Sequence, residues 1–412
     1  MNRRAAILGG PAAVTHDHAA VCRWPHFDAR DEQAVLAVLH DGNVSTHPVI
    51  RDLEREYAAR FQRRHAIAHC NGTAALHAAF FALGLQPGDE VLVPSATFWA
   101  SVLPMCWHGL VPVFCESEPE RLGIDPADME RRITPRTRAV VVVHLWGMPS
   151  KMSEIRAVAA RHGLKIIEDA SHTHGASWHA TSCGALGDIS VFSLQGDKLA
   201  PGGEGGILLC DDDACYERAL CLGDITRIIE LPGAARRFAA TSFGIKTRIA
   251  PLSAALARVQ LAKLDEHNAL RNANHRRLSL ALEALGFDTF LAPPHIQRVY
   301  FEYIIRPRDT GLAIPHLIEA LQAEGCRISL PRYPLLHQQP FFTEGHWRAV
   351  ARLGQECPPS DYAQVALPNT EAAAHTLLRL PVFPNADNGI IGDYIEAFTK
   401  VFEASEAIAS RT

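Results

Sequence analysis

The amino-acid sequence lacks the features that mark several classes of protein. No apolar run approaches the roughly 20 residues that a membrane helix needs, so we expect no membrane partner. No basic stripe or block of like charge occurs in this chain of net charge −5, so we expect no nucleic-acid partner. The opening stretch Met1–Pro11 begins basic, but Gly9 and Gly10 break it before it reaches the length of a signal-peptide core.

Common nucleotide and metal motifs are missing as well. Gly202–Gly206 does not match G-x-G-x-x-G, and no G-x-x-x-x-G-K-[ST] occurs, so nicotinamide and ATP sites lack support. The ten cysteines form no C-x-x-C pair, and we expect reduced, mostly buried thiols in a cytoplasmic chain. His172, His174, His179 and Cys183 are zinc-ligand residue types, but their spacing matches no common structural zinc site, and we predict no metal.

What the sequence does contain is a long alternation of short apolar strands and helices. Its 412 residues, 48% hydrophobic and 21% charged, suffice for two or three domains of roughly 150 residues with a large core. We expect helices at 31–40, 49–61, 74–83 and 151–162 and strands at 65–68, 90–93, 112–114, 139–145, 164–169, 189–193 and 206–210. This order predicts an α/β fold with a mainly parallel sheet between helices.

The pattern changes in the second half of the chain. Residues 212–250 show little periodicity and are expected to form a long connection, and 252–267 are expected to form a helix. Later we expect a strand at 300–305, a helix around Ile314–Leu321 and a last helix at roughly 390–407. We therefore predict an N-terminal arm at 1–30, a large domain at 31–270 and a smaller α+β domain at 271–412.

Lys198 has surroundings that suit covalent chemistry. It follows a predicted strand that ends in Ser193, and Gly196 and the cluster Gly202–Gly206 flank it. Glycines let a backbone approach a ligand closely, and a buried amine has a lowered pKa and becomes nucleophilic near neutrality. A Schiff-base lysine, a phosphate-holding serine and a buried acid for a pyridinium nitrogen are what pyridoxal phosphate chemistry requires. A solvated surface lysine is the alternative.

Two segments could hold the phosphate of such a group. Asn71-Gly72-Thr73 lies between a predicted strand and a predicted helix, where free N–H groups and the helix dipole favour an anion. Gly72 permits close approach, and the hydroxyl groups of Thr73 and Ser193 could donate hydrogen bonds. An ordinary helix cap and an ordinary serine at the end of a strand are the alternatives.

Three further residues could contact the ring. Asp169 ends a buried strand, so its carboxylate should reach the crevice where open α/β sheets bind ligands and could pair with the ring nitrogen. Phe98 follows another strand and could stack on the ring. The alternative for Phe98 is a buried position in the hydrophobic core. His172 could cover the other face or bond the ring oxygen, although a lone histidine usually does neither. A helix-capping or loop-tying role is the alternative for Asp169.

Together these segments resemble the DegT/DnrJ/StrS family of aminotransferases of fold type I, and the resemblance covers nearly the whole chain. The segments that carry it are Asn71–His77, Pro87–Val91, His144–Gly147, Glu168–His172, Lys198 with Gly203–Gly206, and Tyr333–His337. The opening Ile7–Pro11 is similar to the start of the cyclitol and aminohydroxybenzoate branch.

The resemblance implies a role for each candidate residue. Lys198 would form the Schiff base with pyridoxal 5′-phosphate and then move protons, and Asp169 would pair with the pyridine nitrogen. Phe98 would stack on the ring, and His172 would lie close to it, at a position where the family more often has glutamine. The phosphate would be held by Gly72, Thr73 and Ser193.

The resemblance also implies a homodimer with shared active sites. The segment that members borrow from the neighbouring subunit typically reads G-[YF]-N-Y-[RN], and here it is Gly244–Arg248. Lys246 replaces the asparagine, whereas Arg248 keeps a cation for phosphate or substrate. The implied activity is transfer of an amino group from glutamine or glutamate to a keto-cyclitol or keto-sugar in natural-product biosynthesis. A dehydratase or other lyase of the same family, or a non-catalytic ligand-binding relative, are the alternatives.

Overall fold

The computed structural model describes residues 4–308, 310–353 and 361–410. Residues 1–3 of the predicted arm and Cys357 lie outside the described residues. The other nine cysteines are free thiols, and seven of them are buried, which agrees with the prediction for these positions. No helix in the described part of the chain is both long and apolar enough to span a bilayer.

A seven-stranded sheet forms the centre of the molecule, in the order β1-β9-β8-β5-β4-β2-β3. Neighbouring strands from β8 through β5, β4 and β2 to β3 run parallel, whereas β9 is antiparallel to both β8 and β1. The prediction of a mainly parallel sheet is therefore confirmed. Its strands are β1 (His65–His69), β2 (Glu90–Pro94), β3 (Val111–Cys115), β4 (Thr137–Val143), β5 (Lys165–Asp169), β8 (Ile189–Ser193) and β9 (Gly206–Cys210).

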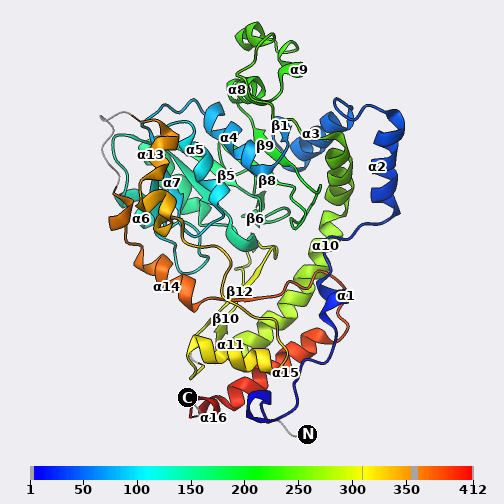
Figure 1. Ribbon diagram of the computed structural model, residues 1–412, viewed down its shortest axis with the longest axis vertical. Helices are drawn as coiled ribbons and strands as arrows, with labels where there is room; N and C mark the ends of the chain where they lie inside the picture. The colour runs from blue at the N-terminus through cyan, green and yellow to red at the C-terminus, as the bar shows by residue number, and fades with distance from the viewer. Residues whose placement is uncertain (1–3, 309, 354–360, 411–412) are drawn as a thin grey trace.

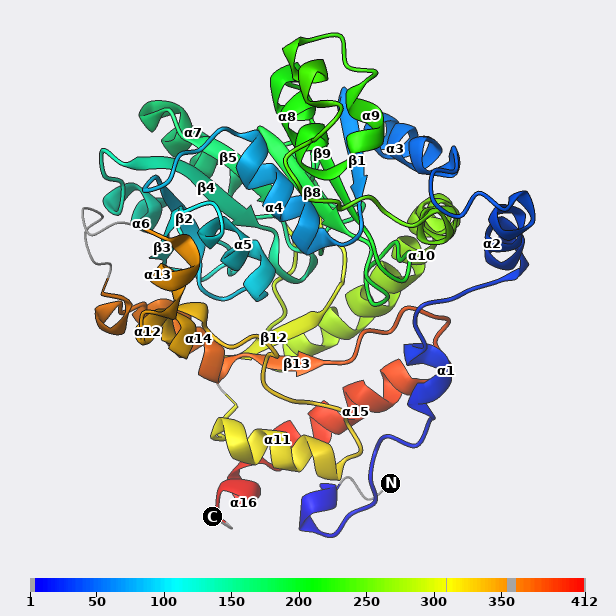
Figure 2. The ribbon, with the colours of Figure 1, turned by 45° about the horizontal axis from the view of Figure 1, so that its top comes forward.

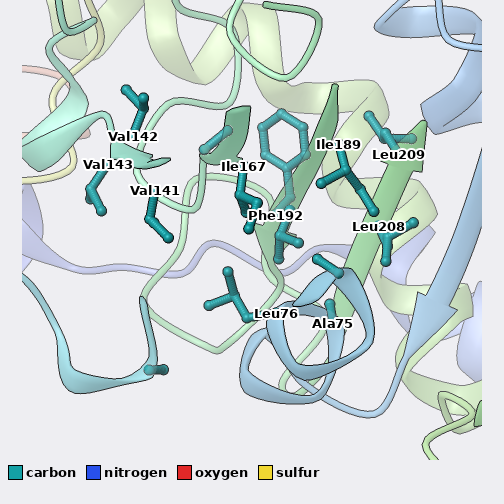
Figure 3. Close-up of a cluster of buried hydrophobic side chains, with 14 of the residues drawn as sticks. Ala75, Leu76, Val141, Val142, Val143, Ile167, Ile189, Phe192, Leu208 and Leu209 are labelled. Atoms are coloured by element: carbon teal, nitrogen blue, oxygen red, sulfur yellow. The ribbon is translucent and has the colours of Figure 1, made fainter. Parts of the chain in front are cut away.

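The central strands are buried because they are apolar at successive positions, as parallel strands covered on both faces require. Val140, Val141 and Val142 of β4 are fully inaccessible to solvent. Figure 3 shows the side chains of these strands gathered with two residues of α4 (Gly72–Ala82), Ala75 and Leu76. A single hydrophobic cluster therefore holds the sheet and its helices together.

Helices alternate with the strands of this sheet, as the sequence pattern predicted. Besides α4 these helices are α2 (Ala29–Asp41), α3 (Val49–Arg60), α5 (Leu103–Cys106), α6 (Pro126–Arg131) and α7 (Met152–His162). Three later helices lie near the same sheet in Figures 1 and 2: α12 (Pro340–Thr343), α13 (His346–Ala351) and α14 (Pro368–Thr376). Short 3₁₀ turns lie at η1 (Ala6–Leu8), η2 (Trp99–Ser101), η3 (Leu145–Gly147), η4 (Ala234–Phe238), η5 (Leu336–Gln338) and η6 (Tyr362–Gln364).

The structure corrects two expectations in the middle of the chain. Residues 212–250 were expected to form a long connection, but they contain two helices, α8 (Asp213–Gly223) and α9 (Ile225–Ile228). Both helices project from the top of the molecule in Figure 1. The helix expected at 252–267 is α10, and it runs on from Pro251 to Ala284. Its extension is stabilised by buried polar contacts, such as the hydrogen bond from Asn274 Nδ2 to the Phe383 carbonyl at 2.9 Å.

A second, smaller hydrophobic cluster lies at the opposite end of the molecule from α8 and α9 (Figures 1 and 2). It joins the N-terminal residues to the sheet β10-β12-β13 and to the last helices. Its elements are α1 (His18–Cys22), the C-terminal part of α10, β10 (Phe287–Asp288), β12 (Tyr303–Pro307), α11 (Ile314–Ala323), β13 (Leu378–Leu380), α15 (Ile390–Glu403) and α16 (Ser405–Ala409). A third small sheet joins β6 (Ser177–Trp178), β7 (Thr181–Ser182) and β11 (Ile296–Gln297).

The predicted domain limits at 30/31 and 270/271 stay a prediction. α10 passes without a break through the second of these limits. Residues of α12 and α13, and further along Tyr362, Leu367 and Leu377, belong to the large cluster, although they lie in the predicted small domain. The two clusters therefore do not divide the chain into consecutive segments.

Candidate active site

Five strands of the large sheet end at one edge, and candidate residues lie at or just after the ends of four of them. β2, β4, β5 and β8 are parallel and end in Pro94, Val143, Asp169 and Ser193. β1 is antiparallel to β9 and so runs in the same direction as β8, which brings its end to the same edge. Since open α/β sheets bind ligands beyond the carboxyl ends of their strands, this edge is the candidate active site.

Lys198 lies in the loop between β8 and β9, where its ammonium nitrogen stands 4.2 Å from the centre of the Phe301 ring. Burial lowers the pKa of Lys198 to about 8, and the nearby Asp169 carboxylate opposes that shift. The indole N–H of Trp24 donates to the Lys198 carbonyl oxygen at 3.0 Å, so the N-terminal arm fixes the lysine backbone. A substantial share of the Lys198 amine is therefore neutral near pH 8.

Asp169 is buried at the end of β5 and is held by two donors. The hydroxyl of Ser101 donates to its Oδ2 at 2.7 Å, and the backbone N–H of Ser171 donates to its Oδ1 at 3.1 Å. Because Ser101 donates to the carboxylate, its oxygen accepts from the Thr97 hydroxyl at 3.0 Å. This relay orients the carboxylate beside Lys198.

His172 is buried three residues after Asp169 and stacks on Phe301, with ring centres 4.0 Å apart and planes 14° apart. Its Nδ1 accepts a hydrogen bond from the Trp146 N–H at 3.3 Å, so the proton of the neutral ring is on Nε2 and faces the Tyr333 oxygen at 3.4 Å. Burial, together with the charges of Lys198 and Arg332, holds the pKa of His172 well below its usual value. The ring is therefore a neutral, fixed wall of the crevice.

Gly72, Ser193 and Gly206 pack closely together at the start of α4. A Cβ on Gly72 would lie 2.9 Å from Ser193 Cβ, and a Cβ on Gly206 would overlap the Asn71 carbonyl oxygen, so larger residues do not fit. Asn71 caps α4 by accepting from the Ala74 N–H at 2.8 Å. Within the described residues, the N–H groups of Gly72 and Thr73 have no acceptor, and both are at the positive end of the helix dipole.

Phe98 is 43% exposed and lies between Trp99 and Tyr333. The segment Tyr333–His337 is fixed beside it, because His337 Nδ1 pairs with Ser95 Oγ at 2.7 Å. Phe98 therefore does not occupy the core position that was its alternative. Its stacking on a ring stays a prediction.

Arg248 is not among the groups that the structure brings to Lys198. Its guanidinium donates to Ser45 Oγ at 2.9 Å and Thr226 Oγ1 at 3.3 Å and pairs with Asp224 at 3.6 Å. Its backbone forms an isolated antiparallel β-bridge with His69, which lies at the end of β1 and close to the start of α4. Lys246, two residues before it, is exposed.

The structure does not gather the four zinc-type residues found in the sequence. Among the described residues, the group within metal-ligand reach is His144, Glu168 and Cys183, all buried. His144 Nδ1 accepts from the Ser150 N–H at 3.0 Å, and His144 Nε2 pairs with Glu168 at 2.9 Å. Both ring nitrogens are thus engaged within the protein, so this cluster ties loops together and offers no imidazole lone pair to an ion.

Four residues contact the candidate residues in ways that the sequence analysis did not predict: Trp24, Ser101, Phe301 and Tyr333. Tyr333 stood in a segment that the resemblance marked, so a signal for it existed. Phe301 and Trp24 come from distant parts of the chain and carry no local pattern that points to Lys198.

Fold and comparisons together define a pyridoxal 5′-phosphate-dependent aminotransferase of fold type I. The model of the DegT/DnrJ/EryC1/StrS aminotransferase family matches residues 25–399, and the chain belongs to that family.

Individual relatives agree with this assignment. The chain is 32% identical over 407 residues to L-glutamine:2-deoxy-scyllo-inosose aminotransferase of Streptomyces kanamyceticus, covering 94% of this chain and 95% of the relative. It resembles DesV of S. venezuelae, solved in complex with a ketimine intermediate, with a TM-score of 0.77 and 30% identity over 92% of this chain and 95% of the other. An aminotransferase structure from Psychrobacter cryohalolentis aligns with a TM-score of 0.82 and 26% identity, covering 93% of this chain and 99% of the other.

The residues at the sheet edge fit pyridoxal 5′-phosphate chemically. Lys198 offers a nucleophilic amine, and Asp169 offers a buried carboxylate within its electrostatic reach. The unpaired N–H groups of Gly72 and Thr73, with Ser193 beside them, offer the donors that a phosphate needs. Lys198 would therefore meet the aldehyde of the cofactor, Asp169 its ring nitrogen, and Gly72, Thr73 and Ser193 its phosphate.

Proposed function

We propose that this protein transfers an amino group from glutamine or glutamate to the ketone of a keto-cyclitol or keto-sugar in natural-product biosynthesis. The observation that carries the proposal is the Lys198 amine, whose pKa burial lowers to about 8, beside the Asp169 carboxylate at the ligand-binding edge of the sheet. The names of the relatives support the substrates, since they include aminotransferases for L-glutamine with inosose acceptors and a trideoxyglucose transaminase.

When bound, pyridoxal 5′-phosphate supplies an aldehyde for the amine and a ring that takes up the electrons released at the substrate carbon. With the cofactor bound, Lys198 would hold its aldehyde carbon through the neutral Nζ. When this amine is free, it would take the proton from the donor Cα and later return one to the acceptor carbon. A pKa of about 8 suits both directions of that transfer.

The neighbouring residues are proposed to position the bound cofactor and to balance the charges of its ring nitrogen and phosphate. Asp169, oriented by Ser101, holds the proton on the pyridine nitrogen. Phe98 stacks on one face of the ring, and His172 lies close to it as a neutral imidazole. Gly72, Thr73 and Ser193 hold the phosphate.

We further propose that the enzyme works as a homodimer in the cytoplasm. Arg248 and Lys246 would then serve the neighbouring subunit's site, and this chain would receive the same pair in return. Support comes from the exposed apolar side chains of Phe243 and Ile245, which precede Lys246 and suit a buried subunit contact. The nine free thiols in the described part of the chain suit a reducing compartment.

The Lys198→Ala variant tests the proposed function. We expect it to lose the visible absorbance of the lysine-bound cofactor, to resist fixation of the cofactor by borohydride, and to lose turnover of glutamine with an inosose acceptor. Lys165→Ala is the matched control, because Lys165 is a surface lysine paired with Asp188 at 3.0 Å. Absorbance and turnover that survive in Lys198→Ala would refute the assignment, and release of water without an amino donor would identify a dehydratase instead.

A further inference from the structure

A second cation, Arg332, lies over the Phe301 ring that contacts Lys198. Its guanidinium carbon is 5.5 Å from the centre of this ring and 5.6 Å from the centre of the Tyr333 ring. Lys198 Nζ is 4.2 Å from the centre of Phe301, so the two cations lie at most about 10 Å apart, the sum of their distances to the shared ring. After burial and the Asp169 carboxylate, the charge of Arg332 is the next influence on the pKa of Lys198, which it lowers. Arg332 therefore belongs to the surroundings of the reactive amine.

The guanidinium group of Arg332 is fixed on one side and open at its end. Its Nε donates to Oε1 of Glu302, whose side chain is 3% exposed. Within the residues that the structure describes, Nη1 and Nη2 of Arg332 make no hydrogen bond, and the Arg332 side chain is 40% exposed. The planar fork of a guanidinium can donate two parallel hydrogen bonds to one carboxylate. The end of Arg332 therefore offers such a pair of donors to a ligand.

The charges around Arg332 favour an anion. The buried Glu302 carboxylate is shared by two guanidinium groups, because Nη1 of Arg379 also lies 3.8 Å from its Oε1. One carboxylate balances only one of these two positive charges. Asp197, in the loop of Lys198, attracts Arg332 as well, but it is exposed, and solvent and salt weaken its effect. Positive charge therefore remains for a ligand at the open end of Arg332.

The amino donor carries an anion at a matching distance from its reacting nitrogen. In an α-amino acid the carboxylate carbon is about 2.5 Å from the amine nitrogen, because a single carbon atom separates them. A carboxylate bound by two parallel hydrogen bonds has its carbon about 4 Å from the guanidinium carbon. An amine at the position of Lys198 Nζ and a carboxylate on Arg332 thus span about 6–7 Å, within the limit of about 10 Å that the Phe301 ring sets. A keto-cyclitol carries no charge, so it offers Arg332 no anion.

We propose that Arg332 binds the α-carboxylate of the amino donor through Nη1 and Nη2, and that Glu302 is a positioning residue that holds the guanidinium through Nε. This role rests on the proposed function and makes it more specific, because it assigns donor recognition to one residue. Arg332 then acts in the donor half-reaction, where a carboxylate is present, and not in the acceptor half-reaction with a keto-cyclitol. An arginine that only stabilised the fold would affect both half-reactions alike.

Arg332→Gln tests this role in the cofactor-loaded enzyme. With L-glutamine alone, loss of the visible absorbance of the lysine-bound cofactor follows the donor half-reaction, and we expect its kcat/KM to fall about 30-fold, as loss of a charged hydrogen-bonded pair does. With 4-aminobutanamide, which is glutamine without its α-carboxylate, the rate should not change. The acceptor half-reaction, in which a keto-cyclitol restores the absorbance of donor-treated enzyme, should not change either. Binding of glutaramate, which keeps the carboxylate but has no amine to react, should weaken about 30-fold in calorimetry.

Arg379→Gln is the matched control, because it removes one positive charge from the same Glu302 carboxylate and leaves Arg332 in place; we expect it to change the donor half-reaction little. Arg332→Lys guards against a folding defect in Arg332→Gln and should lose less, since it keeps the charge without the fork.

Equal losses in the two half-reactions, an equal loss with 4-aminobutanamide, or unchanged glutaramate binding would overturn the role of Arg332. A loss confined to the acceptor half-reaction would overturn it too, because Arg332 would then bind the acceptor. A wild-type enzyme whose absorbance no amino donor changes would instead refute the proposed function. Glutaramate binding needs no turnover, so it would still decide whether Arg332 binds a carboxylate.

Discussion

The titration of Lys198 is the property on which the proposed chemistry depends most directly. Burial lowers its pKa from 10.5 to about 8, while the Asp169 carboxylate raises it and so limits the shift. A fall of this size corresponds to roughly 300-fold more neutral amine at any pH below both values. Replacing Asp169 by asparagine removes the main opposing charge, so we expect the pKa of Lys198 to fall below 8 in Asp169→Asn.

Nuclear magnetic resonance can measure this shift, because the whole chain has only six lysines. Reductive methylation with ¹³C-formaldehyde labels each amine of the cofactor-free protein, and the chemical shift of each methyl signal follows its protonation. The signal missing from Lys198→Ala identifies Lys198. Lys151 and Lys165 are internal controls, since hydrogen bonds and charges of their acidic partners raise their pKa values above the usual value.

Two outcomes would refute the reasoning. A Lys198 midpoint near that of an ordinary lysine would show that the amine is not desolvated in solution. A midpoint that rises in Asp169→Asn would show that the carboxylate does not act on Lys198 as an opposing charge. Either result would remove the electrostatic basis for assigning the covalent role to this lysine.

Two glycine substitutions extend the test to the backbone. Gly147→Ala should lower the free energy of unfolding in urea by about 2–4 kcal/mol, because Gly147 has φ 99° and a Cβ there would overlap the Val299 carbonyl oxygen. Gly163→Ala is the control, because Gly163 has φ 65° and a Cβ there would meet nothing within 4 Å. An equally mild loss of stability in both variants would contradict the contact with Val299. Gly72→Ala should weaken pyridoxal 5′-phosphate binding about tenfold in a titration of the cofactor-free protein, because the added Cβ would lie 2.9 Å from Ser193 Cβ; unchanged affinity would place the phosphate elsewhere.

The local apolar pattern was sufficient to predict the strands of the large sheet. β4 is apolar at consecutive positions and is buried on both faces, as its sequence indicated. The same pattern placed Asp169 and Ser193 at strand ends, so their meeting at one edge follows from parallel strand direction alone. These features were predictable because they depend on residues that are neighbours in sequence.

The course of α10 beyond residue 267 was not predictable in this way. The predicted helix ended at residue 267, and Arg271, Asn274 and His275 beyond it are polar, yet all three are buried. His275 Nε2 accepts from the Phe383 N–H at 3.4 Å, and Asn274 Nδ2 donates to the carbonyl oxygens of Phe383 and Asn385. The segment that satisfies Asn274 and His275 lies more than a hundred residues away, so a window of local sequence contains no sign of it.

The sequence by itself determined the fold class, the family and the identities of the lysine, acid and glycines at the sheet edge, because hydrophobic periodicity and ordered motifs are local properties. Only the tertiary structure decided that Phe301 and Trp24 contact Lys198, that Arg248 pairs with Asp224, and that Arg332 lies over the same Phe301 ring as Lys198. These contacts join residues from separate elements, and their geometry exists only once the sheet, the N-terminal arm and the C-terminal segments have packed together.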